Sequence, residues 1–562
     1  MSIKAEEKPL SKIFCSEYKF IIPSYQRPYS WGIEQAEKLF DDIYESFTDN
    51  KEKEFFLGSI VLIKKSDNKI SEVIDGQQRL TTLTILWSSL CHAIEISSDK
   101  SQKAINYIKD IKGYLLEEGK ISQNINPSYR VSLRERDRSI FKYVQDVKIN
   151  DLLSKNENEI SNEAQLNIQL NTKYLTNKAT GLESSVYEFI NYLTNKCYLV
   201  VVSTQDASSA MRIFSVMNNR GLDLKPSDII KAEVLSELSM DDQTSLSEEW
   251  ESYEEIVGRE EFSQLFSHIN MIYKKEKITS SLVDEFKLYV LKQFTDKKIF
   301  INEILKSYAE NYTLINENKY ISPNFQIEIN NYISWLNRIP NKDWMPVALS
   351  FLKEFSNVGE GKIKNFFQNL ERLASYLLMA GDNVNKRILR YRNVLEQIDT
   401  DSVDGTIQSL DLNMDEKRIF KESIEGDIYK YSPSVKRYLI LRLDQFLSDG
   451  GAIYDPKILT IEHVLPQTVD LNSEWAVLWP DEDERKQWLH KLGNIVPLNK
   501  KSNSAAKNYE FERKKSAYFS GNNNISSYLL TTQVISESIW TPEVVERRQK
   551  SLIALLKNKW SL

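Results

Sequence analysis

A run of polar residues, Asp75-Gly76-Gln77-Gln78-Arg79, follows a strand-like segment and precedes a long apolar one. At a strand-to-helix junction the backbone N–H groups of the first helical turn point outward, and the helix dipole favours a bound phosphate. Arg79 opposes that dipole unless an anion or a carboxylate compensates it. The run therefore predicts an anion site. The alternative is a structural turn in which Gly76 bends the chain, Asp75 caps the helix and the two glutamines are solvated.

A second segment upstream, residues 22–31 (IPSYQRPYSW), combines two prolines, two tyrosines, a tryptophan and an arginine. The prolines stiffen it into an extended loop. A rigid loop that presents Arg27 and aromatic rings suits a base and a phosphate, through stacking and charge-assisted hydrogen bonds. The alternative is a proline-rich strand whose aromatic rings fill the core.

The elements that must position these residues can be read from periodicity. Residues 55–63 (FFLGSIVLI) and 70–76 (ISEVIDG) predict a β-hairpin, and apolar residues at helical spacing predict an amphipathic helix over 33–47. The apolar segment after Gly76 predicts a buried helix of about five turns. Residues 197–204 (CYLVVVST) predict a buried strand.

Farther along the chain the pattern becomes mainly helical. A polar stretch at 154–182 lacks clear periodicity and is interpreted as a loop or insertion, whereas 206–218 has an apolar helical face. A new helix is expected at Lys225-Pro226, with proline in its first turn. Residues 230–445 are almost all amphipathic helical pattern, and the turn residues at 448–451 mark the start of a small C-terminal domain.

Composition excludes several classes of protein. The 562 residues are 41% hydrophobic and 27% charged, with a net charge of −7, which excludes collagenous, disordered and disulfide-scaffold chains. The length suggests roughly three or four folded units. With no overall basic field, a polyanion partner requires a local basic patch.

Cysteine and histidine usage narrows the chemistry. Three separated cysteines form no C-x-x-C pair, which argues against disulfides and thiolate zinc sites and favours a reducing cytoplasm. No signal core and no apolar run of roughly 18 residues is visible, so a soluble, cytoplasmic protein without a membrane partner is expected. With only four histidines, histidine chemistry is expected to depend on one residue.

Several motifs in one order resemble a known family. IPSYQRPYSW, FFLGSIVL, IDGQQRLTTL and FSVMNNRGLDLKPSDIIK, over residues 15–235, are similar to the N-terminal domain of GmrSD-type restriction proteins. The resemblance implies a ParB/sulfiredoxin-like α+β fold and nucleoside triphosphate binding and hydrolysis centred on Asp75–Arg79, with Gln26 and Arg27 lining the same pocket. Asn219 and Asp228 match the last motif, or are turn and helix-start residues.

The C-terminal segment TIEHVLPQ (460–467), followed by Leu492-Gly493-Asn494-Ile495 and Asn503, resembles the His-Me finger (HNH) nuclease pattern at the C-terminus of GmrSD-type proteins. The resemblance implies a ββα-metal fold, with Glu462 and His463 on one strand, Asn494 at the far side of the hairpin and Asn503 on the following helix.

Phosphodiester cleavage explains why these residue types are needed. A neutral imidazole can deprotonate water, so His463 is the candidate base. A divalent ion, Mg²⁺ or Mn²⁺, must offset charge on the phosphate, and hard oxygen ligands such as Glu462 and Asn503 can hold it. Asn494 is expected to orient the imidazole by a hydrogen bond, and Asn508 is a rival to Asn503 as ligand.

A local basic segment accompanies this motif. Residues 491–515 contain seven Lys or Arg against two acids, although the whole chain is acidic. This excess predicts contacts with a nucleic acid backbone, and the alternative is a solvated basic helix face. The acidic run at 481–484 is interpreted as a solvated loop. The predicted nucleic acid contacts are Lys500, Lys501, Lys507, Arg513, Lys514 and Lys515.

The sequence thus predicts a predominantly helical protein with three domains: an α+β nucleotide domain at 1–235, an all-α middle domain at 236–445 and an HNH-type nuclease domain at 446–562. The resemblance implies an anti-phage, modification-dependent endonuclease that acts on double-stranded phage DNA and is regulated by ATP or GTP. Two other hypotheses are a nucleotide-sensing defence scaffold whose nuclease is inactive or targets RNA, and an N-terminal domain that binds DNA with nucleotide only as allosteric ligand. Homo-oligomers are left open.

Overall fold

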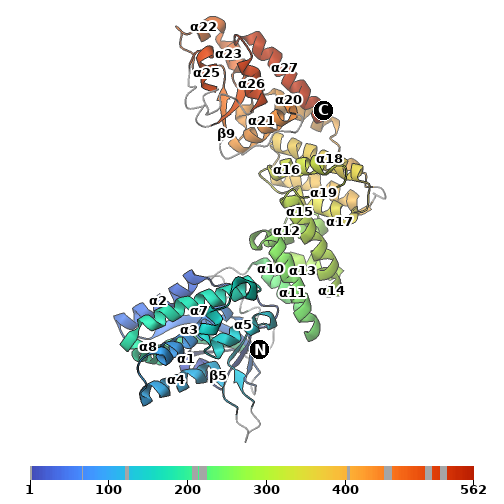
Figure 1. Cartoon of the computed structure of the whole chain (residues 1–562). Coiled ribbons are helices and arrows are strands. Elements are labelled where there is room, and N and C mark those ends of the chain that lie inside the picture. The colour runs from blue at the N-terminus through green and yellow to red at the C-terminus, as the bar shows by residue number, and fades with distance from the viewer. Residues whose placement is uncertain are drawn as a thin grey trace. The chain divides into compact units, whose positions relative to one another are not determined.

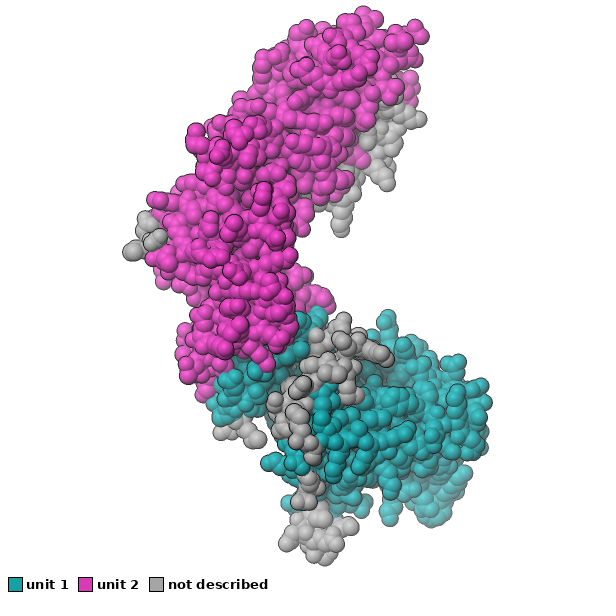
Figure 2. All heavy atoms as spheres, turned by 180° about the vertical axis from the view of Figure 1, so that it is seen from behind, with its two compact units in different colours: residues 1–251 teal, residues 252–562 magenta. Residues whose placement is uncertain are grey.

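The computed structural model describes residues 3–65, 68–119, 126–205, 210, 213, 225–400, 405–448, 459–499, 509–518 and 528–562. The chain divides into two compact units, Met1–Glu251 and Ser252–Leu562, which have different colours in Figure 2. The finer division into three domains stays a prediction. Each unit is described by itself.

Unit 1 is built on a mixed β-sheet. Its six strands, among the described residues, have the order β1-β8-β3-β4-β2-β7. Strands β3 and β4 form the predicted antiparallel hairpin, β3 runs parallel to β8, and β2 runs parallel to β4 and to β7. The predicted strands at 55–63 and 197–204 are confirmed with the same bounds. The strands are β1 (Lys4–Pro9), β2 (Lys19–Ile21), β3 (Phe55–Ile63), β4 (Ile70–Asp75), β7 (Val131–Ser132) and β8 (Cys197–Thr204).

Helices cover one face of this sheet. The predicted buried helix is α3 (Gln77–Ile96), which is enclosed along almost its whole length and packs between α4 (Gln102–Leu115) and α7 (Glu163–Gly181). The predicted amphipathic helix is α2 (Ile33–Asp49), which lies beside α7 (Figure 1). These helices and the inward-facing side chains of the strands form one continuous apolar core.

The interpretation of residues 154–182 as a loop is wrong, because α7 occupies 163–181. Its buried face carries Asn171, Thr172 and Thr176 as well as apolar residues, so the hydrophobic period is weak. The donors of these polar groups have partners: the Asn171 side-chain nitrogen donates to the Trp31 carbonyl at 2.7 Å and to the Tyr29 hydroxyl at 2.9 Å. Burial of paired polar groups costs little, so the helix packs without an apolar stripe.

The motif that follows β8 lies largely outside the described residues, including most of the predicted helix at 206–218 and Asn219. The described chain resumes at Lys225, and the predicted helix there is α10 (Pro226–Ser236). The Asp228 carboxylate accepts a hydrogen bond from the Lys225 backbone N–H at 3.3 Å, which is the helix-start role that the sequence left open.

Unit 2 begins with the predicted helical region. Among the described residues, no helix is long and apolar enough to cross a membrane. The helix α11 (Met240–Val257) spans the boundary between the units. The main helices that follow are α12 (Arg259–Lys274), α13 (Leu282–Tyr289), α15 (Lys306–Asn316), α16 (Gln326–Asn337), α17 (Met345–Glu354), α18 (Glu360–Met379), α19 (Val384–Thr400), α20 (Met414–Glu425) and α21 (Pro433–Leu447).

The C-terminal part of unit 2 combines a short hairpin with helices. Strands β9 (Leu459–His463) and β10 (Ile495–Asn499) pair antiparallel, with His463 opposite Ile495. A core rich in tryptophan lies between this hairpin and the helices α25 (Phe511–Tyr518), α26 (Leu529–Ile535) and α27 (Pro542–Lys559). The interpretation of 481–484 as a loop is wrong, because Asp481 caps α23 (Glu482–Leu489). The acidic residues of its first turn interact favourably with the helix dipole.

Candidate functional sites

The turn between β4 and α3 is held by Gly76. Its φ is +89°, a left-handed conformation that favours glycine, and a Cβ there would lie 2.4 Å from Cγ2 of the buried Ile60. A side chain at this position therefore conflicts with both the backbone and the sheet. The predicted strand-to-helix junction is confirmed, and it brings Asp75 and the first turn of α3 to one edge of the sheet.

Gln78 fastens the proline-rich loop to this turn. Its Oε1 accepts hydrogen bonds from the backbone N–H groups of Ser30 at 2.9 Å and Trp31 at 3.2 Å, while its Nε2 donates to the Pro28 carbonyl at 3.0 Å. The interpretation of the glutamines as solvated is wrong, because Gln77 and Gln78 are both buried. A glutamine side chain supplies the acceptor and the donor that this loop needs.

Gln77 completes the connection to the predicted nucleotide loop. Its Nε2 donates to Oε1 of Gln26 at 3.3 Å, and Nε2 of Gln26 donates to the Ile74 carbonyl at 3.1 Å. All three glutamines thus have internal partners, so they position the loop and the turn. The residues expected to contact a ligand are therefore the charged residues beside these glutamines.

Those charged residues are Asp75, Arg79 and Arg27, all partly exposed. Burial raises the pKa of the Asp75 carboxyl, while the Gly76 N–H and the charges of Arg79 and Arg27 oppose this rise. Burial lowers the pKa of Arg79, and Asp75 opposes that shift. The structure therefore brings one acid and two cations of the predicted site into mutual electrostatic range.

A second glycine makes room for the Arg79 guanidinium. Nη1 donates to the Ser59 carbonyl at 3.0 Å, which fixes the side chain against β3. Gly58 has φ +108°, and a Cβ there would lie 2.9 Å from Nη2 of Arg79. The cation is thus directed by the strand beside it rather than by Asp75 alone.

In unit 2 the strand β9 ends on Glu462 and His463. His463 is 4% exposed, and its Nε2 lies 2.9 Å from Nδ1 of His490. The Gln467 amide nitrogen lies 3.1 Å from Nδ1 of His463. An amide nitrogen only donates, so Nδ1 accepts and the neutral ring of His463 carries its proton on Nε2.

The surroundings of His463 keep its ring neutral. Tyr429 packs against both imidazoles, with ring centroids 4.4 Å from His463 and 4.7 Å from His490. Burial, together with the nearby His490, Lys514 and Lys436, lowers the pKa of His463 to about 3. The ring is thus in the form that a general base requires, and Nδ1 must leave Gln467 before it can accept a proton from water.

The side-chain hydrogen bonds of Asn494 go to groups other than the imidazole, so the prediction of a direct hydrogen bond to His463 is wrong. The side chain is fully buried, and its Oδ1 accepts from the backbone N–H of Leu465 at 2.7 Å and from Nε1 of Trp540 at 3.1 Å. Its Nδ2 donates to the Leu489 carbonyl at 2.9 Å. Asn494 therefore fixes the backbone that follows His463, and the imidazole is oriented by Gln467 and His490.

Glu462 is paired with Lys514. The Lys514 ammonium donates to Oε1 of Glu462 at 2.9 Å and to the His463 carbonyl at 2.7 Å, and its side chain is 1% exposed. Burial raises the pKa of Glu462, and Lys514 opposes this rise. The prediction that Lys514 contacts nucleic acid does not fit this burial, because the ammonium is used to hold the carboxylate beside the histidine.

The other basic residues predicted to contact nucleic acid differ in their surroundings. Arg513 is exposed, with its guanidinium 3.6 Å from the Tyr509 ring centroid, whereas Lys515 pairs with Glu512 at 2.9 Å. The other predicted contacts and ligands, Lys500, Lys501, Asn503, Lys507 and Asn508, lie outside the described residues.

The predicted metal site also includes Asn503, which lies outside the described residues. Among the residues that the structure describes, no three His, Cys, Asp or Glu side chains form a cluster suited to a metal ion. Oε2 of Glu462 accepts no hydrogen bond from the described chain, so this carboxylate keeps one oxygen for a hard cation. Glu462 fits the predicted role as one ligand, and further ligands must come from elsewhere.

Sequence reasoning missed three side chains of this cluster, namely Tyr429, Gln467 and His490. Gln467 lies four residues after His463 within the motif itself, which is a signal that could have been used. His490 is one of only four histidines and lies four residues before Asn494. Tyr429 carries no signal, because it comes from a different part of the chain, a short 3₁₀ turn at Ile428–Lys430.

Together these features define a two-unit protein. Its α+β unit carries a charged turn between a strand and a helix, and its helical unit ends in a hairpin that presents Glu462 and His463. Protein-family models identify it further: the GmrSD restriction endonuclease N-terminal domain matches residues 10–235, and the GmrSD restriction endonucleases C-terminal domain matches residues 414–555. The chain belongs to this GmrSD family, which supports a restriction-type nuclease role in defence. A search of curated proteins found no match.

Proposed function

We propose that the chain is a metal-dependent endonuclease that cleaves double-stranded DNA, in particular modified phage DNA, through an HNH-type site in unit 2. The observation that carries this proposal is His463, held neutral at the end of β9 beside Glu462. The antiparallel pair β9 and β10, with α25 after it, is compatible with a ββα-metal fold. The family match supports DNA as the substrate class.

In the proposed reaction His463 accepts a proton from water through Nδ1, after release from Gln467. The hydroxide attacks phosphorus, the bond to the leaving oxygen breaks, and that oxygen takes up a proton from solvent. Glu462 and Asn503 would hold Mg²⁺ or Mn²⁺, which supplies charge compensation on the phosphate. Lys514 keeps the Glu462 carboxylate beside His463.

We further propose that unit 1 binds and hydrolyses a nucleoside triphosphate, ATP or GTP, at the turn between β4 and α3. Arg79 and Arg27 would bind phosphate oxygens, and the N–H groups of the first helical turn would add a favourable dipole. Asp75, near both cations, supplies a carboxylate for the hydrolytic step. Gln26, Gln77 and Gln78 would hold the loop that carries Arg27.

One experiment tests both sites. Plasmid nicking is measured with Mg²⁺ on modified and unmodified DNA, with and without ATP or GTP, and phosphate release is measured in parallel. His463→Ala should abolish nicking and leave phosphate release unchanged, because the base belongs to unit 2 alone. Retained nicking by purified His463→Ala would overturn the nuclease assignment.

Asp75→Ala should lose phosphate release by a factor of 10 or more, whereas Asp110→Ala, an exposed carboxylate on α4, serves as the matched control and should not. If the nucleotide site regulates the nuclease, Asp75→Ala must also change the nicking rate. If nucleotide changes DNA affinity, cognate DNA must change nucleotide affinity by the same factor. Equal nicking by wild type and Asp75→Ala at all nucleotide concentrations would show two independent activities.

A further inference from the structure

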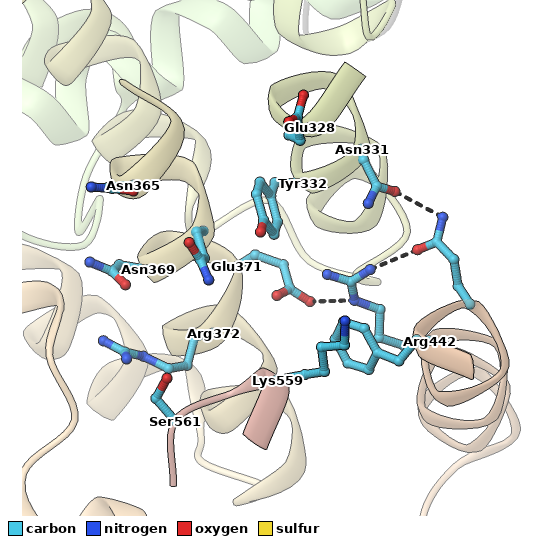
Figure 3. A pocket seen from close by; sticks show the side chains of 13 residues that line it. Glu328, Asn331, Tyr332, Asn365, Asn369, Glu371, Arg372, Arg442, Lys559 and Ser561 are labelled. Atoms are coloured by element: carbon cyan, nitrogen blue, oxygen red, sulfur yellow. Dashed lines mark hydrogen bonds and ion pairs between the residues drawn. The ribbon is translucent and has the colours of Figure 1, made fainter. Parts of the chain in front are cut away.

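Unit 2 contains a polar cavity that the proposed nuclease chemistry does not use. Its volume is 620 Å³, within the range of small-molecule sites, and it lies among α16, α18, α21 and the end of α27. Figure 3 shows side chains of these elements converging on it, with Asn369 and Arg372 on α18, Tyr332 on α16 and Arg442 on α21.

The floor of the cavity is a buried charge network. Nε of Arg442 donates to Glu371 at 3.1 Å, and both side chains are 1–2% exposed. The Tyr438 hydroxyl also donates to Glu371, at 2.9 Å, and Nη1 of Arg442 donates to Gln445 at 2.7 Å. With its charges already compensated, this floor is rigid and offers no open cation for a simple anion.

The walls, in contrast, carry hydrogen-bonding groups that are not used. Within the described chain, the amides of Gln368 and Asn369 have no polar partner, and neither has the Tyr332 hydroxyl. Gln368 and Asn369 lie one turn before Arg372 on the same face of α18, so they face the cavity together. Amide groups side by side can donate to and accept from the edge of a planar heterocycle.

Aromatic and cationic groups complete the lining. Tyr332 and Phe446 both line the cavity, and the Arg442 guanidinium lies 4.0 Å from the Phe446 ring centroid. Arg372 pairs with Asp411 at 2.7 Å, but its buried Nε has no partner among the described residues. Lys559 adds a second cation at the C-terminal end of α27. Ring faces, free amides and cations are the set that recognises a base and its phosphate.

We propose that this cavity binds one nucleotide unit, with its base against Tyr332 and the amides of α18 and its phosphate beside Arg372. A lipid or another apolar ligand would bury the free amides without partners, which is costly. An isolated phosphate would leave the aromatic side chains and most of the volume unused.

The cavity is linked to the nuclease cluster by α21. On this helix Lys436 lies 3.8 Å from the ring centroid of Tyr429, which packs against His463. Arg442 follows six residues later, roughly 9 Å along the helix axis. A nucleotide in the cavity can therefore belong to the strand that is cleaved, and this part of the inference rests on the proposed function. A free nucleotide offers the same chemistry, so the test separates the two sources.

The test uses the full chain with Arg79→Ala, which silences the proposed site in unit 1, in EDTA so that no cleavage occurs. Calorimetric titrations use the four deoxynucleoside 5′-monophosphates, with deoxyribose 5-phosphate and inorganic phosphate as probes that lack a base. The variants are Tyr332→Leu and Asn369→Ala, and Asn316→Ala, an exposed amide at the end of α15, is the matched control.

At least one monophosphate should bind, with Kd raised about 10-fold or more by Tyr332→Leu, since loss of one stacked base costs roughly that factor. Asn369→Ala should raise Kd about 5-fold or more, whereas Asn316→Ala should leave it unchanged and the probes without a base should bind at least 10-fold more weakly. Equal Kd values for wild type, Tyr332→Leu and Asn369→Ala, or no monophosphate binding at all, would overturn the proposal.

A second arm identifies the source of the nucleotide. A duplex with a central mismatch, whose base is easily extruded, is compared with a duplex that has an abasic site at the same position. If the strand is the source, Tyr332→Leu weakens binding of the mismatched duplex only; unchanged affinity for both duplexes assigns the cavity to a free nucleotide. Because these measurements need no cleavage, loss of nicking by His463→Ala and loss of binding by Tyr332→Leu are independent outcomes.

Discussion

Substitution of Gln78 by leucine should release the proline-rich loop while leaving the sheet and α3 folded. Leucine is close in size to glutamine, but it can neither accept from the N–H groups of Ser30 and Trp31 nor donate to the Pro28 carbonyl. The apolar packing of α3 would change little, so the effect is confined to the loop that carries Gln26 and Arg27.

The magnitude follows from the bonds that are lost. Two neutral hydrogen bonds to the loop amides contribute roughly 1–3 kcal/mol together. Because about 1.4 kcal/mol corresponds to a factor of ten, the amides of Ser30 and Trp31 should exchange with solvent roughly 5- to 140-fold faster. Hydrogen exchange measured on a peptide that spans 28–35 would report this directly.

Two further results would separate this reasoning from a general loss of stability. Peptides from the centre of α3 should keep their protection. Gln102→Leu should change neither region, because Gln102 is exposed and its side chain, within the described part of the chain, bonds only to Asn106. Nucleotide affinity should fall in Gln78→Leu although no ligand-contacting residue has changed. Unchanged exchange of the Ser30 and Trp31 amides would refute the assignment of Gln78 as the residue that fastens the loop.

Two other predictions follow from backbone and burial. Gly76→Ala should lower the free energy of unfolding of unit 1 by roughly 2–5 kcal/mol, from left-handed strain and the contact with Ile60, whereas Gly113→Ala, with open space around it on α4, should be neutral or stabilising in urea titrations. Burial and Lys342 lower the pKa of His268 to about 4, so below about pH 6.5 the unfolded chain takes up a proton that the folded chain does not. The free energy of unfolding should therefore keep the full contribution of His268 above about pH 6.5 and fall toward pH 4 by up to roughly 1.4 kcal/mol per pH unit. His268→Phe should remove this slope in urea midpoints at pH 4.5, 5.5 and 7.5, and an unchanged slope would contradict it.

Local patterning was enough to predict the elements that carry the first site. Alternating and β-branched residues predicted β3 and β8 with the same bounds, and a long apolar run after Gly76 predicted α3. These features depend on neighbours in the sequence, because strand and helix periods repeat over two to four residues. The placement of Asp75 and Arg79 at the junction of a strand and a helix could be predicted for the same reason, because both elements are local in the sequence.

Tertiary structure alone decided how polar residues are used. The sequence does not show that Gln78 binds a loop almost 50 residues away, that α7 buries its asparagine and threonines, or that Lys514 is enclosed beside Glu462 rather than exposed to a polyanion. In the same way, His463 is held by Gln467 and by His490, which lies 27 residues away, while Asn494 serves the backbone. The identity of a polar residue in the sequence does not tell whether its side chain is solvated or bonded to a buried partner. Only the packing of distant segments decides between the two, because that packing removes the water and supplies the partner.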